Sequence, residues 1–413
     1  MDEIINIETI DKAYENIKDV IKNTPTQKLH RFSKKYNANI YLKREDLQEV
    51  RSYKIRGAFN LMSSQVGKTS KFVCASAGNH AQGVAFSSSY LKKKSIIFMP
   101  KTTPKQKVSR VSYFGGEYIE IKLEGNNFDE CSNIAQDFAE KHKYFYVPPF
   151  NNYTIISGQG TIGKEILSQV KDIDYMICPI GGGGLISGVG MYIKTIKPSV
   201  KLIGIEPEGA ASMYESIKNN RIVNLTQLDH FADGVAVSKV GDITFKIAKK
   251  IIDKIIIVPE GMIASTMIDI YQNEGIISEP AGALSLSALD SIKDEIKGKN
   301  VVCILSGGNN DILRYPEVME KSLVYQGLKH YFMIEFYQKP GELKDFVTKC
   351  LGKNDDIVRF EYIKKVSKEQ GSALVGIEIA SKNDLLPLIE KMDKNNIKYT
   401  KIEKDSLLYE TLI

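Results

Sequence analysis

Between residues 71 and 147 the hydrophobic and polar positions alternate in a way that predicts strand and helix in turn. Apolar runs at 71–75, 95–99, 118–123 and 144–147 have the length of buried strands. The stretches between them carry apolar residues at helical spacing. Strands that alternate with helices through short connections predict a parallel, doubly wound sheet.

The same alternation occupies flanking parts of the chain. An amphipathic helix is expected within residues 1–22, and another helix at 55–62. Further strands are expected at 38–43, 175–180, 201–205, 254–258 and 301–305. Chain from both sides of a compact unit at about 53–150 would then form one larger domain. Open α/β sheets bind ligands at the carboxyl ends of their strands, so we expect the site in the crevice between the two.

Beyond a connector at 321–329 the pattern changes. The strands expected there are 330–337, 356–363, 373–379 and 398–402, with helices at 341–351 and 384–392. The order β-α-β-β-α-β is that of a ferredoxin-like module. Because this part contains no plausible catalytic constellation, we expect residues 1–320 to be catalytic and residues 330–413 to be regulatory.

The composition and charge of the chain argue against several classes of function. The 413 residues are 43% hydrophobic and 26% charged, and 56 basic against 50 acidic side chains leave a formal charge of +6. Lysines are scattered rather than clustered with aromatics, so nucleic-acid binding is not indicated. No apolar run is long enough to suggest export or a membrane span. The five cysteines are far apart and form no Cys-x-x-Cys pair, which is typical of thiols in a reducing compartment. A soluble cytoplasmic protein is expected.

Three stretches carry the candidate chemistry. Lys54 lies between the aromatic Tyr53 and the sequence Ile-Arg-Gly. The polar turn 76–80 (Ser-Ala-Gly-Asn-His) and the four glycines 181–184 each follow a strand-like run and precede a helix-like one. Glycine amides at a helix N-terminus bind phosphate, and a lysine forms a Schiff base with an aldehyde. These parts indicate pyridoxal 5'-phosphate. A flexible turn without a ligand is the alternative for the glycines, although four in a row are costly to order.

A second glycine motif has a different interpretation. Gly158, Gly160 and Gly163 match G-x-G-x-x-G and nearly match a phosphate-binding P-loop. The preceding residues 151–153 are not a buried strand, and Glu165 stands where a P-loop needs Ser or Thr. Close packing of a helix that carries these glycines is favoured over nucleotide binding.

Two further polar positions allow more than one role. His80 has no carboxylate or cysteine at a metal-ligand spacing, which favours a structural hydrogen bond over a ligand role. Ser306, with Gly-Gly-Asn after it, ends the strand predicted at 301–305. It either faces a cofactor or begins an ordinary glycine turn.

Five ordered motifs together resemble the threonine dehydratase (threonine ammonia-lyase) family of fold type II pyridoxal-phosphate enzymes. They are Ser-Tyr-Lys-Ile-Arg-Gly-Ala-Phe (52–59), Ser-Ala-Gly-Asn-His-Ala-Gln-Gly-Val-Ala (76–85), Gly-Gln-Gly-Thr (158–161), Gly-Gly-Gly-Gly-Leu (181–185) and Ser-Gly-Gly-Asn (306–309). The resemblance covers residues from about 20 to 320. The tail that begins Ser-Leu-Val-Tyr-Gln-Gly-Leu at 322 resembles the single ACT-like regulatory domain of the short biosynthetic form.

The resemblance implies a role for each matching position. Lys54 would be the Schiff-base lysine and the base, and Asn79 would contact the 3′-oxygen of the cofactor. Gly181, Gly182, Gly183, Gly184 and Leu185 would hold its phosphate. Tyr53 would form an aromatic wall in place of the usual Phe, Ser306 would face the pyridine nitrogen, and Ser76 would bind the substrate carboxylate. No metal is expected, since Ser212 replaces an Asp that accompanies the acidic Glu206 position in relatives.

The implied reaction is the conversion of L-threonine, or L-serine, to the 2-oxo acid and ammonia, the first step of isoleucine biosynthesis. Isoleucine or valine would be the effector, and a homo-oligomer, dimer or tetramer, is expected. The alternatives are a catabolic serine/threonine dehydratase, a racemase of the same fold, and a catalytically silent amino-acid sensor. The tail disfavours the first two, and the intact Lys54, Asn79 and glycine run disfavour the third.

Overall fold

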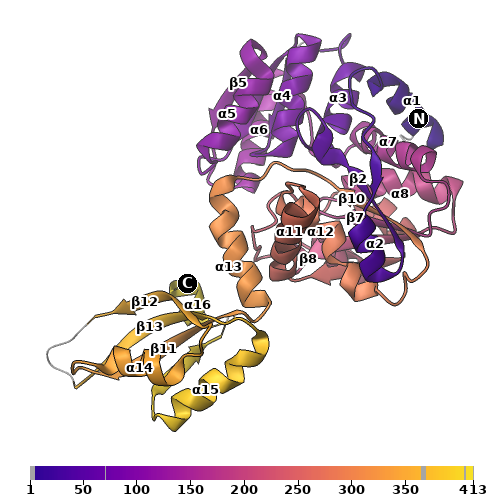
Figure 1. Cartoon of the computed structure of the whole chain (residues 1–413). Helices are drawn as coiled ribbons and strands as arrows, with labels where there is room; N and C mark the ends of the chain where they lie inside the picture. The colour runs from indigo at the N-terminus through magenta and orange to yellow at the C-terminus, as the bar shows by residue number, and fades with distance from the viewer. Residues whose placement is uncertain (1–4, 70, 364–368, 404–405, 413) are drawn as a thin grey trace. The chain divides into compact units, whose positions relative to one another are not determined.

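The computed structural model describes residues 5–69, 71–363, 369–403 and 406–412. The chain forms two compact units, one up to Ile312 and one from Leu313 (Figure 1). The first unit contains two separate sheets of six and four strands, and the second contains one sheet of four. No helix in the described residues is long and apolar enough to cross a membrane.

The six-stranded sheet combines segments from both ends of the first unit. Its order is β1 (Thr26–Lys28), β2 (Asn39–Arg44), β10 (Asn300–Leu305), β7 (Tyr175–Pro179), β8 (Lys201–Pro207) and β9 (Lys254–Val258). Only β1 pairs antiparallel to its neighbour, and the remaining pairs are parallel. Because β2 and β10 pair along their whole length, the chain before and after the small sheet belongs to one sheet.

The four-stranded sheet is parallel throughout and lies between β2 and β7 in the sequence. Its order is β5 (Ile119–Leu123), β4 (Lys94–Met99), β3 (Lys71–Ala75) and β6 (Phe145–Tyr146). Four helices accompany it: α3 (Lys54–Ser64), α4 (Asn79–Leu91), α5 (Lys105–Gly115) and α6 (Phe128–His142). Both sheets are of the doubly wound type predicted from the alternation, which confirms the expected fold class.

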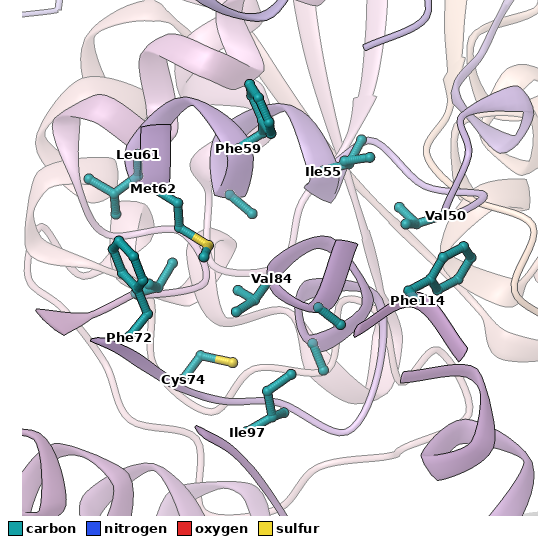
Figure 2. Close-up of a cluster of buried hydrophobic side chains, with 14 of the residues drawn as sticks. Val50, Ile55, Phe59, Leu61, Met62, Phe72, Cys74, Val84, Ile97 and Phe114 are labelled. Carbon is teal, nitrogen blue, oxygen red and sulfur yellow. The ribbon is translucent and has the colours of Figure 1, made fainter. Parts of the chain in front are cut away.

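Alternate residues of β3 face opposite layers of helices. Phe72 and Cys74 join a core cluster with α3, α4 and α5 (Figure 2), whereas Val73 and Ala75 pack with α6. A strand buried on both faces reads as a continuous apolar run, which is why its position was predictable. The α3 side chains in this cluster fix the helix that begins at Lys54.

The larger sheet carries its own helices. They are α1 (Ile7–Ile17), α2 (His30–Tyr36), α7 (Tyr153–Gln169), α8 (Gly184–Ile196), α9 (Ser212–Lys218), α10 (Asp242–Ile251), α11 (Glu260–Glu274) and α12 (Pro280–Ser287). A Cβ at Gly160 or Gly163 of α7 would lie 3.0 or 3.1 Å from backbone oxygens of α8. The second glycine motif therefore serves close helix packing, as predicted, and not nucleotide binding.

The second unit has the predicted β-α-β-β-α-β order. It consists of α13 (Tyr315–Tyr325), β11 (Lys329–Tyr337), α14 (Glu342–Cys350), β12 (Asp356–Tyr362), β13 (Gln370–Glu378), α15 (Leu385–Lys394), β14 (Lys398–Ile402) and α16 (Leu407–Leu412). The strands pair antiparallel in the order β12-β13-β11-β14, the ferredoxin-like arrangement. Helix α13 covers part of the stretch 321–329 that was expected to be a connector.

Candidate active site

A cavity of about 430 Å³ in the first unit collects most of the residues singled out in the sequence. Strand ends and helix starts from both sheets contribute to its wall. The predicted site residues that line it are Tyr53, Lys54, Ser76, Asn79, Gly181, Gly182, Gly183, Gly184 and Leu185. The parallel sheets bring these distant segments together because each one follows the carboxyl end of a strand or begins a helix.

Lys54 is the first residue of α3, and its side chain lines the cavity. Nζ donates to the Pro149 carbonyl at 3.3 Å and lies 5.4 Å from the centre of the Tyr53 ring. Burial lowers the pKa of the Lys54 amine to about 8, against an opposing effect of the Glu279 charge. A considerable fraction of this amine is therefore neutral near physiological pH, the form that attacks an aldehyde or accepts a proton.

The backbone of the glycine run 181–184 lies very close to residues of neighbouring segments. A Cβ at Gly182 would lie 2.3 Å from the Phe150 ring, and one at Gly181 would lie 2.9 Å from Val235 Cα. Gly183 has φ of +88°, a backbone region that favours glycine, and α8 begins directly after it. The first amides of a helix have no partners within the helix, so this turn presents free N–H groups to the cavity.

Asn79 is the first residue of α4, and both polar atoms of its side-chain amide form hydrogen bonds. Its Nδ2 donates to Glu279 Oε1 at 2.7 Å, and its Oδ1 accepts from Asn309 Nδ2 at 2.8 Å. All three residues line the cavity. The sequence motifs predicted a role for Asn79 but for neither of its partners.

Glu279 is a buried carboxyl group directly before α12. Its burial and the nearby Asp233 raise its pKa to about 7, whereas the Asn79 hydrogen bond and the charges of Lys107 and Lys54 lower it. Lys107 of α5 forms an ion pair with Asp233, and both residues also line the cavity. The cavity wall thus contains a carboxyl group and an amine whose pKa values are shifted toward neutrality.

The remaining polar positions of the Ser-Ala-Gly-Asn-His turn have local roles. The Ser76 hydroxyl accepts a hydrogen bond from the Gly78 amide at 3.2 Å. His80 is buried, and its Nε2 lies 2.9 Å from the Val147 carbonyl. Burial and the Lys54 charge lower the pKa of His80 to about 3, so this ring is neutral. The hydrogen bond that the sequence favoured for His80 is thus present, and the residue also lines the cavity.

Ser306 lies at the end of β10, close to the lysine turn, but it is not among the residues that line the cavity. Its backbone carbonyl accepts from the Tyr53 amide at 3.1 Å, and its hydroxyl donates to the Ala281 carbonyl at 3.2 Å. The neighbouring segment 307–309 brings Asn309 into the cavity wall instead. The hydroxyl is thus satisfied by a local partner.

Glu206, the acidic position weighed for a cation, caps a helix. Its two carboxylate oxygens accept from the amides of Met213 and Tyr214 at 2.8 and 2.7 Å. Burial raises its pKa to about 8. Within the part of the chain that the structure describes, no cluster of three or more His, Cys, Asp or Glu side chains is suited to hold a metal.

A fully buried group of four charged residues lies behind the lysine turn. Arg56 of α3 forms ion pairs with Glu45 at 2.8 Å and with Glu165 of α7 at 2.7 Å. Lys43 of β2 pairs with Glu165 at 2.6 Å. Two positive and two negative charges balance one another, and they tie the start of α3 to β2 and α7.

These residues fit pyridoxal phosphate. A lysine with a lowered pKa, a glycine cradle that a Cβ would obstruct and an amide donor on α4 line one cavity. The second hydrogen of Asn79 Nδ2 has no acceptor among the described residues. Glu279 and Lys107 carried no signal in the sequence beyond their charge, because their neighbours in the site come from distant segments.

Comparison with known families agrees with the fold. The family model described as "Pyridoxal-phosphate dependent enzyme" matches residues 17–307, and the "C-terminal regulatory domain of Threonine dehydratase" matches residues 320–412. The chain is 51% identical to L-threonine dehydratase biosynthetic IlvA of Halalkalibacterium halodurans, and the match covers 99% of each chain. It is 48% identical to the protein of the same name from Staphylococcus aureus, again over 99% of each.

Solved structures share about three quarters of the chain. The processed form of threonine deaminase isoform 2 from Solanum lycopersicum is 39% identical with a TM-score of 0.72, and covers 77% of this chain and 94% of its own. Serine racemase from Dictyostelium discoideum is 30% identical with a TM-score of 0.69, and covers 75% of this chain and 99% of its own. The racemase has the fold in common, whereas the match of residues 320–412 is to a dehydratase regulatory domain. The chain therefore belongs to the biosynthetic L-threonine dehydratases, pyridoxal-phosphate-dependent lyases with a C-terminal regulatory domain.

Proposed function

We propose that this chain converts L-threonine to 2-oxobutanoate and ammonia by β-elimination, using Lys54 as both the point of cofactor attachment and the base. The observation that carries the proposal is the Lys54 amine, with its lowered pKa, in the same cavity as the glycine run and Asn79. Bound pyridoxal phosphate supplies an electron sink for the carbanion formed at Cα.

The chain's own residues then have distinct tasks. Lys54 would be the residue that holds the cofactor covalently, and its neutral amine would be the base that accepts the Cα proton of the substrate. The amides of Gly181–Gly184 and Leu185 bind the cofactor phosphate at the start of α8. Tyr53 would form an aromatic wall for the cofactor ring, and Asn79 would donate to its 3′-oxygen.

Ser76 is assigned to the substrate carboxylate. It lies in the turn before α4, whose first amides are available to an anion. Ser306 is assigned to the neighbourhood of the pyridine nitrogen, where its hydroxyl would exchange the Ala281 carbonyl for the ring. A neutral hydroxyl there would not keep the ring nitrogen protonated, which would favour loss of the β-hydroxyl over transamination.

The second unit is proposed to bind isoleucine or valine as a feedback effector. A cavity of about 240 Å³ is present in this unit, lined by Phe336, Tyr337, Gln338, Lys339, Pro340, Gly341, Glu342, Leu343, Phe360 and Tyr362. Gly341 has φ of +97° and precedes α14, so free amides for a carboxylate stand beside an apolar wall for a branched side chain.

Threonine deamination commits carbon to isoleucine, which makes this reaction the first step of that biosynthesis. We also propose a cytoplasmic location, which the free thiols of the five cysteines support. A homo-oligomer, either a dimer or a tetramer, is proposed as the working form. The outer strands β12 and β14 each have one neighbour in the described sheet, so each has a free edge for pairing with a second copy.

A steady-state assay tests the proposal. Purified enzyme loaded with pyridoxal phosphate is assayed for 2-oxo acid and ammonia from L-threonine and from L-serine, with and without isoleucine or valine. We expect turnover of threonine and a shift of its concentration dependence by isoleucine. A protein that forms D-amino acid without ammonia would be a racemase, and one that binds amino acids without turnover would be a sensor.

A further inference from the structure

Glu279 is a buried carboxyl group in the cavity wall for which the proposed reaction has no task. We propose that Glu279 is a positioning residue: it fixes the amide of Asn79 so that the remaining N–H of Nδ2 is offered to the 3′-oxygen of pyridoxal phosphate. This inference rests on the proposed function, in which Asn79 contacts that oxygen. Glu279 acts through Asn79 and is given no contact with the substrate.

The hydrogen bonds around Asn79 allow one orientation of its amide. Nδ2 donates to Glu279 Oε1 at 2.7 Å, and Oδ1 accepts from Asn309 Nδ2 at 2.8 Å. Asn309 Nδ2 also donates to the Val50 carbonyl at 2.7 Å, which fixes the polarity of the Asn309 amide. A flipped Asn79 would set its oxygen against a carboxylate and its nitrogen against another N–H donor. Both contacts would be repulsive, so the pair of partners selects the donor orientation.

The backbone around Glu279 makes room for this arrangement. A Cβ at Gly307 would lie only 2.4 Å from Glu279 Oε1. The Glu279 amide donates to the Gly307 carbonyl at 3.3 Å, so the two segments are also joined along the backbone. The glycine after Ser306 therefore leaves space for a carboxylate oxygen, and this oxygen is the one that Asn79 contacts.

The charges that face Glu279 come from three other segments. Lys54 of α3 and Lys107 of α5 favour its ionised form, and Asp233 opposes it. Burial and Asp233 raise the pKa of Glu279 to about 7, despite the Asn79 hydrogen bond. Only the ionised carboxylate is purely an acceptor, and its hydrogen bond with an amide is roughly twice as strong as a neutral one. The hold on Asn79 should therefore be strongest above about pH 7 and weaken below it.

A double-mutant cycle on cofactor affinity tests the inference. Pyridoxal phosphate is titrated into cofactor-stripped wild type, E279Q, N79A and the double variant, with the absorbance of the bound cofactor as the readout. We expect E279Q to raise Kd by roughly fivefold at pH 8, because a charged acceptor is replaced by a neutral one. In the N79A background the same change should have no effect, since the residue through which it acts is gone.

The pH dependence separates positioning from a general structural role. At pH 6 the wild-type carboxyl is mostly protonated, so the Kd ratio of E279Q to wild type should approach one. A fivefold effect that is equal in both backgrounds or equal at both pH values would overturn the proposal, as would no effect at pH 8. The variant E260Q, at a partly buried carboxylate that accepts from the Gly209 amide, is the control and should keep the wild-type Kd.

A second variant covers the case in which E279Q does not fold. E279D keeps the charge but withdraws it by one methylene, which breaks the contact with Asn79, and it should also raise Kd at pH 8. Wild-type affinity in folded E279D would overturn the proposal. The failure of the proposed function is distinguishable, because stripped wild-type protein that does not bind pyridoxal phosphate at all would refute the function itself.

Discussion

At the scale of single residues, the buried Lys43 and the partly buried Lys54 show how the surroundings of an amine decide its chemistry. Lys43 is hydrogen bonded to Glu165 at 2.6 Å and to the Thr24 carbonyl at 2.5 Å, so its amine is committed to structure. Lys54 has one long hydrogen bond, to a carbonyl at 3.3 Å, and its amine lines the cavity. The burial of an amine without a close carboxylate favours its neutral form, and this suits Lys54 to covalent and proton-transfer chemistry.

Removal of the Lys54 amine should separate catalysis from cofactor binding. Lys54→Ala is expected to lower kcat by at least about a thousandfold, since both the covalent link and the base are lost. The fold and part of the affinity for pyridoxal phosphate should remain, because the glycine run does not depend on this side chain. Ammonia release and equilibrium titration with pyridoxal phosphate measure the two effects. Threonine turnover near the wild-type rate would refute the assignment.

The pKa of Lys54 predicts how fast stripped enzyme captures its cofactor. Only the neutral amine attacks the aldehyde, so the rate constant for covalent incorporation should rise with pH and level off above about 8. Stopped-flow absorbance of stripped protein mixed with pyridoxal phosphate would record this profile. With an ordinary solvated lysine the rate constant would keep rising toward pH values of about 10.4, and such a profile would contradict the desolvated environment.

Single residues also mark the limit of what the sequence predicts. Lys54, Asn79 and the glycine run stand in local patterns, so their roles could be inferred from the order of residues alone. Glu279 has no such pattern, since its partner Asn79 lies 200 positions away. The same applies to Glu165, which was considered only for a P-loop and instead pairs with Arg56 and Lys43. Partners that arise from folding carry no signal in one sequence.

At the scale of elements, the turn that opens α8 depends on the absence of side chains. Gly182→Ala would place a methyl group 2.3 Å from the Phe150 ring, so the turn or the ring must shift. We expect the Kd for pyridoxal phosphate to rise at least about tenfold, because the helix amides would no longer converge on the phosphate. Gly67→Ala is the matched control, since a Cβ there meets nothing within 4 Å. Equal affinity in both variants would exclude the cradle role of this turn.

The buried charges between α3, β2 and α7 should dominate the stability of this region. Glu165→Gln leaves Arg56 and Lys43 with one carboxylate, Glu45, and we expect it to lower the free energy of unfolding by about 3–5 kcal/mol. Asp11→Asn breaks the exposed pair of Asp11 with Lys164 on the same helix as Glu165 and should cost less than about 1 kcal/mol. Denaturant unfolding of both variants measures the difference. Similar losses of unfolding free energy in both variants would show that the buried charges contribute no more to stability than an exposed ion pair does.

Helices and strands could be predicted from the sequence where burial gives the apolar residues a regular spacing, and less well elsewhere. Strand β10 occupies the residues that the apolar run at 301–305 predicted, with Asn300 before them, because a strand between two parallel neighbours must be apolar on both faces. Helices α11 and α12 lie in a stretch, 260–287, to which no element was assigned. Several of their residues pack against other helices or the sheet, so polar and apolar positions do not alternate cleanly there.

At the scale of the whole molecule, the chain consists of two units, one with mainly parallel sheets and one with an antiparallel sheet. The parallel sheets of the first unit place helix starts and strand ends around one cavity, which suits cofactor chemistry. The antiparallel sheet of the second unit leaves a smaller cavity at the turn between β11 and α14. Separate cavities for substrate and effector are the minimum requirement for allosteric control, in which each ligand must favour one of two states.

The last prediction concerns this coupling. A chain that ends at Ile312 lacks the whole second unit, including α13, and should deaminate threonine while losing any response to isoleucine. In the full chain, isoleucine should shift the threonine dependence by roughly 5–150-fold, which corresponds to about 1–3 kcal/mol of coupling. Leu343→Glu tests the same point without truncation, because it places a charge on the wall of the smaller cavity. This variant should keep its basal activity and lose isoleucine binding in calorimetry. If the intact enzyme neither binds isoleucine or valine at millimolar concentration nor changes its kinetics, the second unit has no sensing role and serves association between copies of the chain instead.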